Sequence, residues 1–323
     1  MMAVGQVYRL VCLVILSVIS LSSIAKGDDR PLLYQVSFNG KTAYLFGSIH
    51  IGKADFYPLP AVVEEAFSQA SGLVVEAKPD NHRIPQLMKK YGRQQYPSDK
   101  ETQALLVKYC EDKQDFCHQI ATFSPWVQAM QISLARFSLM GLSAQFGVDM
   151  TLMEKNGNRP LYELESTEEQ LGLLASFSPN IQWQMLQESI NTSDEEMLLL
   201  VDAWRQGNTA LLIELIEGQL IELSVNKNER VTTKRSIDDL DSESSDLPLS
   251  ENNSILVNRL LWQRNQTMAL GIKQLLNNKD IDNLFVVVGV GHLVGNKNIQ
   301  NVLLKQGVTI KNCWQQQCFG AAH

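Results

Sequence analysis

The sequence of 323 residues lacks the short motifs that mark three common enzyme classes. It contains no H-E-x-x-H, no G-x-S-x-G and no G-x-x-x-x-G-K-[ST] segment. These motifs would indicate a zinc peptidase of the zincin type, a serine hydrolase and a P-loop nucleotide-binding protein, respectively. The sequence also lacks an excess of positive charge, since 28 Lys and Arg stand against 35 Asp and Glu, for a formal net charge of −7. Because little here would neutralise a phosphate backbone, we expect no nucleic-acid partner.

A complete dinucleotide fingerprint and long internal repeats are also missing. Gly289-Val-Gly-His-Leu-Val-Gly295 follows an apolar run, but Val294 stands where the third glycine of the fingerprint should be. Too little chain follows this segment to complete a dinucleotide-binding fold. We therefore expect neither NAD binding nor a solenoid.

The N-terminal segment has the organisation of an export signal. Arg9 precedes the apolar run at residues 10–24, and small residues in Ser23-Ile24-Ala25 follow it. This pattern predicts a signal peptide over residues 1–25, cleavage after Ala25, and a periplasmic or secreted protein. The alternative is a retained anchor, because the run approaches the roughly 18 residues that a membrane helix requires. Membrane association is expected only in that case.

Four cysteines remain once Cys12 is discarded with this segment. They form two close pairs in the sequence, Cys110 with Cys117 and Cys313 with Cys318. Such spacing suits two local disulfides in an oxidising compartment. Four thiols could instead bind zinc, although neither spacing matches a zinc finger beyond a loose likeness at the second pair.

The first part of the predicted mature chain forms a strand, a turn that ends in histidine, a helix and a second strand. Apolar residues alternate over residues 34–38 and 42–46, and Asn39-Gly40 between them is typical of a tight hairpin. Gly47-Ser48-Ile49-His50 follows the second strand. A helical apolar period then covers residues 59–70, and a short buried strand at residues 73–75 ends at Glu76.

The C-terminal part repeats this plan. Residues 284–288 form a continuous apolar run, and Gly289-Val290-Gly291-His292 follows it. The spacing of Ile299, Val302 and Leu303 predicts a short helix before a strand at residues 308–310. Each half is therefore strand, Gly-x-x-His turn, helix and strand.

A long, mostly helical region separates the two halves. Ser124-Pro125 begins one predicted helix, and Thr167-Glu168-Glu169-Gln170 has the form of a capping box. Further helices are predicted over residues 181–190, 194–206, 209–222 and 254–277. Residues 225–253 are polar, so we expect a mobile insertion there.

These elements predict an α/β fold, with α+β as the alternative. We expect one domain over residues 26–323, with a mixed central β-sheet built from the two halves. The helical insertion would cover residues 85–278.

The two histidines carry the chemical prediction. A histidine that follows a strand and a glycine lies at the carboxyl edge of the sheet, where open α/β sheets build their sites. We expect Glu76, at the end of a strand that should neighbour the first turn, to face the same edge as His50 and His292. Two imidazoles and a carboxylate suit Mn²⁺, Co²⁺, Fe²⁺ or Zn²⁺. The alternative is that the histidines only pack and that Glu76 faces solvent.

Arg264 and Asn265 lie within the predicted helix 254–277, beside its apolar stripe. A cation in this position needs an acidic partner. It would either orient Glu76 and stabilise a developing negative charge, or form an ordinary ion pair between helix and sheet.

In order and spacing, several segments together resemble the TraB/GumN family, which is related to the TIKI metalloproteases. The matching segments are Tyr44-Leu-Phe-Gly-Ser-Ile-His50, Tyr57-Pro-Leu-Pro60, Val74-Val-Glu76, Gly147-Val-Asp149 with Leu152, Leu164-Glu165-Ser-Thr-Glu-Glu-Gln170, Arg264-Asn265 with Met268, and Val288-Gly-Val-Gly-His-Leu-Val-Gly295 with Leu303-Leu304 and Gly307.

The resemblance implies a peptidase-like core that depends on a divalent metal, with His50, His292 and Glu76 as its active groups. Arg264 and Asn265 match the helix motif of the family. Glu165 matches its Leu-Glu-Thr segment, which here reads Leu-Glu-Ser.

The function expected from these residues is an exported metal-dependent hydrolase that cleaves an extracellular or periplasmic peptide or protein. A second hypothesis is a binding protein that sequesters a peptide or a haem-like ligand in the same cleft without turnover. A third is a scaffold in which both Gly-x-x-His turns serve only packing.

Overall fold

The computed structural model describes residues 29–98, 100–218, 220 and 255–319. The predicted signal peptide and the polar segment 225–253 lie outside the described residues. Within those residues, no helix combines the length and the apolar character that crossing a membrane requires.

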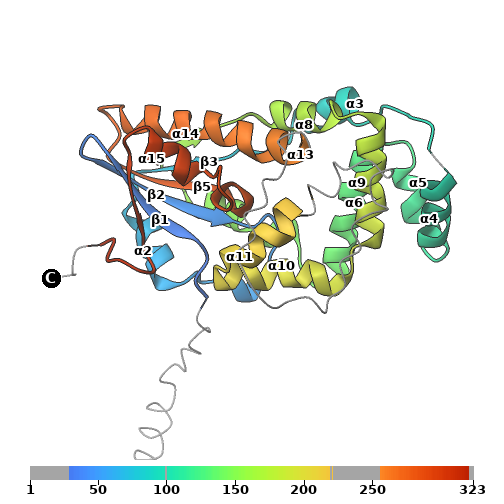
Figure 1. The fold of residues 1–323 in the computed structure, drawn as a ribbon, viewed down its shortest axis with the longest axis horizontal. Coiled ribbons are helices and arrows are strands. Elements are labelled where there is room, and N and C mark those ends of the chain that lie inside the picture. The colour runs from blue at the N-terminus through green and yellow to red at the C-terminus, as the bar shows by residue number, and fades with distance from the viewer. Residues whose placement is uncertain (1–28, 99, 219, 221–254, 320–323) are drawn as a thin grey trace, which may run out of the picture.

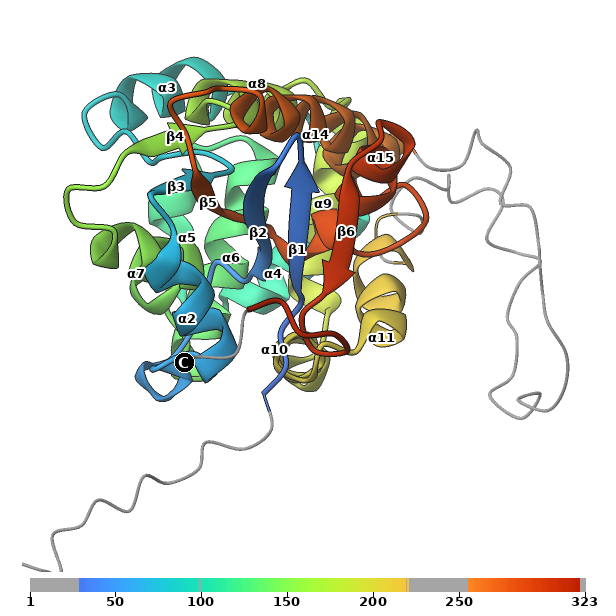
Figure 2. The ribbon, with the colours of Figure 1, turned by 90° about the vertical axis from the view of Figure 1, so that its left-hand side faces the viewer.

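A mixed β-sheet of six strands forms the centre of the molecule, in the order β4-β3-β5-β2-β1-β6 (Figure 2). Its strands are β1 (Leu33–Phe38), β2 (Lys41–Ser48), β3 (Gly72–Val75), β4 (Leu161–Glu163), β5 (Asn283–Gly289) and β6 (Thr309–Asn312). Strands β2, β5, β3 and β4 pair in parallel, whereas β1 pairs antiparallel with both β2 and β6. The predicted α/β class is confirmed.

The predicted hairpin between β1 and β2 turns at Asn39-Gly40. Both residues have positive φ, 50° at Asn39 and 77° at Gly40. A two-residue turn of this type matches the twist of the strands it joins. The turn therefore sets the register in which Phe38 faces Lys41.

Strand β5 lies between β2 and β3, so the last third of the chain completes a sheet begun by the first. Its residues 284–288 are all buried, which explains the continuous apolar run in the sequence. Ser48 is the register partner of Gly289, which brings the two Gly-x-x-His turns side by side. One expectation is wrong: the strand that ends at Glu76 does not neighbour β2, because β5 separates them.

Helices cover the sheet on both faces. Figure 1 shows α14 (Gln263–Leu276) and α15 (Ile299–Lys305) above the sheet and α2 (Ala61–Gln69) below it. Buried side chains of these helices join the main core, in which Phe67 of α2 meets Phe285 of β5 edge to face. This packing fixes the ends of β2, β3 and β5 relative to one another.

The region between the two halves forms a helical body beside the carboxyl ends of these strands (Figure 1). Its helices are α3 (Ile84–Tyr91), α4 (Lys100–Cys110), α5 (Gln114–Ile120), α6 (Pro125–Leu139), α7 (Val148–Lys155), α8 (Thr167–Ala175), α9 (Pro179–Asn191), α10 (Asp194–Gln206), α11 (Thr209–Ile213) and α13 (Ile255–Val257). Short 3-10 turns are η1 (Ala54–Phe56), η2 (Ala144–Phe146) and η7 (Val290–Leu293), and π-helical turns are η3 (Glu214–Gly218) and η6 (Asn258–Trp262). Helices α6 and α9 have small apolar cores of their own, apart from the main core.

Three details of this region differ from the sequence predictions. The capping box begins one residue earlier than predicted, because Ser166 accepts the N–H of Glu169 and the Glu169 carboxylate accepts the N–H of Ser166. The predicted helices 209–222 and 254–277 are interrupted by η3 and η6. Strand β4, with three residues, was not predicted because it is too short to show a period.

Both predicted disulfides are present. Cys110 pairs with Cys117 and Cys313 with Cys318, and the two pairs of Cα atoms lie 6.0 and 5.3 Å apart. These separations are ordinary for disulfides. The four thiols are thereby unavailable as zinc ligands.

Candidate functional site

The structure brings the two Gly-x-x-His histidines and the strand-end glutamate to one point at the carboxyl edge of the sheet. A Cβ added at Gly289 would lie 3.5 Å from Oε2 of Glu76, 3.6 Å from Nε2 of His50 and 3.8 Å from Cδ2 of His292. Nε2 of His292 is 3.6 Å from Oε2 of Glu76. Side chains that are far apart in the sequence therefore surround the same glycine.

Glycine is needed where the two turns meet. A Cβ at Gly47 would come within 3.2 Å of the side chains of Val290 and Leu293 in the second turn. A side chain there would push the turns apart, and one at Gly289 would fill the space between the polar atoms. The two glycines keep His50 and His292 close together.

Asn265 sets the orientation of His292. The amide nitrogen Nδ2 of Asn265 donates to the backbone carbonyl of Lys297 at 2.8 Å, so its Oδ1 faces Nδ1 of His292 at 2.6 Å. Nδ1–H of His292 then donates to Oδ1, and the lone pair of Nε2 is directed toward Glu76. Burial is the main cause that lowers the pKa of His292 to about 4, so this imidazole is neutral at neutral pH.

Glu76 is held as a carboxylate. Its Oε1 accepts from Gln170 at 2.8 Å and from Arg264, and its Oε2 accepts the backbone N–H of Gly289 at 3.1 Å. Burial opposes ionisation, but the charges of His292, Arg264 and His50 and the Gly289 hydrogen bond outweigh it and lower the pKa of Glu76 to about 2. Because His292 is itself neutral, we assign most of this effect to the charges of Arg264 and His50, with the Gly289 hydrogen bond adding to them.

Arg264 links two buried carboxylates. Its Nε lies 3.0 Å from both oxygens of Glu165, its Nη2 lies 2.7 Å from Oε2 of Glu165, and it also pairs with Glu76. Burial lowers the pKa of Arg264, but the two carboxylates outweigh it and raise the pKa further. The side chain therefore does both things considered from the sequence: it orients Glu76 and it ties a helix to the sheet edge.

Asp149 bonds His50 in the way that Asn265 bonds His292. Its Oδ2 lies 3.1 Å from Nδ1 of His50, whose side chain keeps 64% of its area accessible within the cavity. Burial lowers the pKa of His50, but the hydrogen bond and charge of Asp149 outweigh it and raise the pKa to about 9. Both imidazoles are thus held through Nδ1, which leaves Nε2 of His50 near Gly289 and Nε2 of His292 facing Glu76.

Sequence reasoning assigned no role to Asp149 or Gln170. Both lie within family-like segments of the inserted helical region, and that likeness was the only signal for them. Val148 N–H donates to the carbonyl of Ile49 at 2.9 Å, which docks the start of α7 on the first turn. Gln170 reaches Glu76 from α8.

The donor set of the site suits a divalent cation in its chemistry. Two imidazoles and a carboxylate converge, and Oγ of Ser48 and Oδ1 of Asp149 line the same cavity as buried atoms without a hydrogen-bond partner among the described residues. No group of three or more His, Cys, Asp or Glu in the described part of the chain is arranged as a ligand cluster for a metal ion. The residue types fit a metal, whereas binding would require the side chains to rearrange.

His50, Glu76, Ser48, Asp149 and Gln170 line a cavity of about 310 Å³, large enough for part of a small ligand. His292 is buried, 4% exposed, and is not among the lining residues. A polar depression of about 470 Å³ lies beside it, and Pro79 and Thr167 line both. The candidate site is therefore the inner part of a longer concave surface.

The fold and site define a class of α/β proteins in which two neighbouring parallel strands each end in a Gly-x-x-His turn and share one carboxylate. The chain belongs to the TraB/PrgY/gumN family, whose model matches residues 32–312. The resemblance found in the sequence is thereby confirmed.

Two curated relatives are both described as "Uncharacterized protein YbaP". The chain is 28% identical over 137 residues to the one from Shigella flexneri and 28% identical over 136 residues to the one from Escherichia coli (strain K12). Each match covers 41% of this chain and 51% of the relative, so the chain spans about half the length of the curated relatives it matches. No solved structure matches the chain.

Proposed function

We propose that this protein is an exported metal-dependent hydrolase that acts on peptides, with His50, His292 and Glu76 as the metal ligands. The observation that carries the proposal is the convergence of Nε2 of His50 and Oε2 of Glu76 on Gly289, with His292 beside them. Imidazole and carboxylate groups are the usual ligands of catalytic metals that keep an open position for water. The predicted signal peptide supports export.

The residues of the chain prepare such a site in two ways. Asn265 and Asp149 each hold an imidazole through Nδ1, so Nε2 is the ring atom that a metal ion would bind. At His50 this binding would release the proton that the raised pKa retains. Arg264, Gln170 and the N–H of Gly289 hold Glu76 ionised and fix its direction. When bound, a divalent ion would lower the pKa of a coordinated water and polarise a peptide carbonyl.

Arg264 and Glu165 are positioning residues in this proposal. The guanidinium is already bonded to two carboxylates, so its effect on a substrate passes through Glu76. Asn265 acts through His292 in the same manner.

Metal analysis tests the proposal directly. Purified mature protein, His50→Ala, His292→Ala and the control His118→Ala, which removes an exposed histidine of α5, are titrated with Mn²⁺, Co²⁺ and Zn²⁺. We expect wild type and the control to bind one ion, and both site variants to lose affinity by a factor on the order of 100. Equal binding by all four proteins would refute the metal site.

A peptide library tests turnover. New peptide termini, their loss on chelation and their return with Mn²⁺ or Co²⁺ are expected. Cleavage that resists chelation would contradict the proposal, and retention of intact peptides would indicate a binding protein instead.

A further inference from the structure

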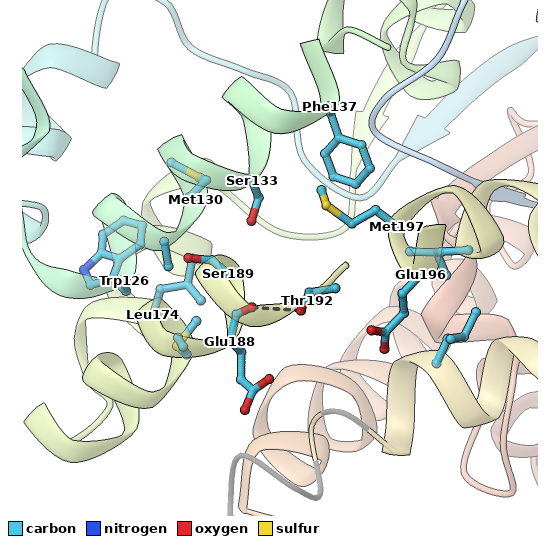
Figure 3. A pocket seen from close by; sticks show the side chains of 14 residues that line it. Trp126, Met130, Ser133, Phe137, Leu174, Glu188, Ser189, Thr192, Glu196 and Met197 are labelled. Atoms are coloured by element: carbon cyan, nitrogen blue, oxygen red, sulfur yellow. Dashed lines mark hydrogen bonds between the residues drawn. The ribbon is translucent and has the colours of Figure 1, made fainter. Parts of the chain in front are cut away.

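A second cavity lies in the helical body, away from the donor groups of the candidate site. It has a volume of about 420 Å³ and is bounded by α6, α8, α9, α10 and η3 (Figure 3). Its lining is mostly apolar and includes Trp126, Met130, Phe137, Leu174 and Met197. This volume lies within the range of roughly 300 to 1,000 Å³ that is usual for small-ligand sites.

Helix α8 connects this cavity to the candidate site. Gln170 bonds Glu76 and lines the site, and Leu174, four residues further along the helix, lines the apolar cavity. Residues four apart lie on the same face of a helix, separated by about 6 Å along its axis. One helix face therefore borders both cavities.

Two further elements, α10 and η3, connect the apolar cavity to the two Gly-x-x-His turns. In α10, Leu200 lines the apolar cavity, and Trp204 donates to the carbonyl of Gly47 in the first Gly-x-x-His turn at 2.9 Å. In η3, Leu215 lines the cavity, and Ile216 lies 3.3 Å from the Cβ position of Gly291 in the second turn. A group held in the apolar cavity would thus lie about one helical turn from residues of both turns.

We propose that the apolar cavity is a specificity subsite for one large apolar side chain, such as Phe, Leu or Met, of a peptide whose backbone crosses the candidate site. This inference rests on the proposed function and names the substrate feature that it selects. Helix α8 borders both cavities, and α10 and η3 contact the two Gly-x-x-His turns, which places the subsite close enough for both parts to belong to one short peptide. Flexible thioethers in the lining adapt to apolar groups of different shape.

The decisive variant fills the subsite. Figure 3 shows the hydroxyl of Ser133 directed into the cavity, so Ser133→Phe should occupy it, whereas Ser138→Phe adds the same bulk at an exposed position of the same helix. Otherwise identical peptides carrying Phe or Asp at each position in turn are compared by kcat/KM. We expect wild type and Ser138→Phe to prefer Phe at one position, and Ser133→Phe to reduce this preference by a factor of about ten or more.

A binding measurement separates this inference from the proposed hydrolysis. A peptide containing 4-bromophenylalanine is added to Glu76→Gln protein in chelator, and quenching of tryptophan fluorescence is recorded with and without Trp126→Phe. Quenching that depends on Trp126 and is lost in Ser133→Phe supports the subsite, even if wild type cleaves nothing. Unchanged selectivity or quenching in Ser133→Phe overturns the subsite, even if wild type cleaves peptides.

A misfolded Ser133→Phe would be recognised by circular dichroism. Met130→Ala, which enlarges the cavity, then supplies the test. We expect it to shift the preference from Phe toward Trp, and an unchanged preference would also overturn the subsite.

Discussion

Asn265 is buried, 1% exposed, and both the nitrogen and the oxygen of its side-chain amide form hydrogen bonds. It donates to the carbonyl of Lys297 and accepts from His292. Asn265→Ala would leave both partners unpaired in the interior. We expect a loss of about 1 to 3 kcal/mol in the free energy of unfolding, measured in urea.

Metal affinity supplies a second readout for Asn265. We expect it to fall on the order of tenfold or more in Asn265→Ala, because His292 loses its orientation. Gln274→Ala, at an exposed amide of the same helix, is the control and should change neither quantity. A variant as stable as wild type would show that His292 does not depend on this partner.

Arg264 is the cation shared by Glu76 and Glu165, and the three side chains are 9 to 17% exposed. Arg264→Leu would leave two buried carboxylates without their cation, so a loss of about 3 to 5 kcal/mol is expected in urea unfolding. Arg264→Lys should recover little, since an ammonium cannot reproduce the forked contact with Glu165. A double-mutant cycle with Glu165→Leu checks the assignment, because strictly additive losses would mean that the two side chains do not interact.

At the scale of single residues, the sequence identified those site residues that lie close to the ends of strands. His50, Glu76 and His292 each come within three residues of the end of a strand, and parallel strands end at one edge of a sheet. Asp149 and Gln170 were not predicted as site residues, because they reach the site from helices. Helical periodicity shows which face of a helix is buried but not which strand end that face contacts. The double pairing of Arg264 was left open for the same reason.

At the scale of secondary-structure elements, the two π-helical turns both contact the second Gly-x-x-His turn. A Cβ at Gly291 would lie 3.3 Å from Ile216 of η3 and 3.4 Å from Leu261 of η6. A π turn inserts an extra residue into the helical repeat, so a search at 3.6 residues per turn predicts an unbroken helix across it. This explains why both helices were predicted as continuous.

Glu217, within η3, is predicted to destabilise the folded protein when its carboxyl group is ionised. Burial raises its pKa, and its Oε1 has no hydrogen-bond partner among the described residues. A raised pKa means that the folded state holds the proton of Glu217 more tightly than the unfolded state does. The protonated carboxyl therefore contributes its full stabilisation below the ordinary pKa of 4.5, and this contribution is lost as the pH rises through the pKa of the folded state. Glu217→Gln should therefore raise the Tm at neutral pH.

The gain from Glu217→Gln should disappear in acid, where wild type is protonated in both states. Melting curves at several pH values measure this. Glu214→Gln, at a neighbouring position in η3, is the control, and a gain independent of pH would contradict the explanation.

The capping box of α8 is predicted to stabilise both the helix and the site. Ser166→Ala removes the bond to the N–H of Glu169 and should cost about 1 kcal/mol in urea unfolding. Ser138→Ala, on an exposed face of α6, should cost close to nothing. Since α8 carries Gln170, we expect the kcat/KM of the proposed peptide hydrolysis to fall as well. An unchanged stability would show that other contacts fix the start of this helix.

For the whole molecule, the sequence predicted the α/β class, the hairpin, the two similar halves and both disulfides. It did not predict the strand order, because periodicity shows that a strand is buried on both faces but not which strands lie beside it. It also missed β4, which leaves the helical region to join β3 at the sheet edge. These features depend on contacts between distant segments.

Removal of residues 279–323 tests how strongly the sheet depends on its late strands. Without β5, strands β2 and β3 lose the partner that lies between them. We expect the shortened chain to lack cooperative unfolding, measured by circular dichroism, and to be digested rapidly by protease. A shortened chain that unfolds cooperatively would show that the helical body folds on its own.

The central position of β5 also affects how the chain folds during its synthesis. A ribosome makes β2 and β3 long before the strand that joins them, so the nascent polypeptide carries two open sheet edges for most of its synthesis. Open edges of this kind can pair with other chains, so the newly made polypeptide is exposed to association until β5 occupies the gap. The two histidine turns can pair only after β5 has been made, so the candidate site is among the last parts of the molecule to form.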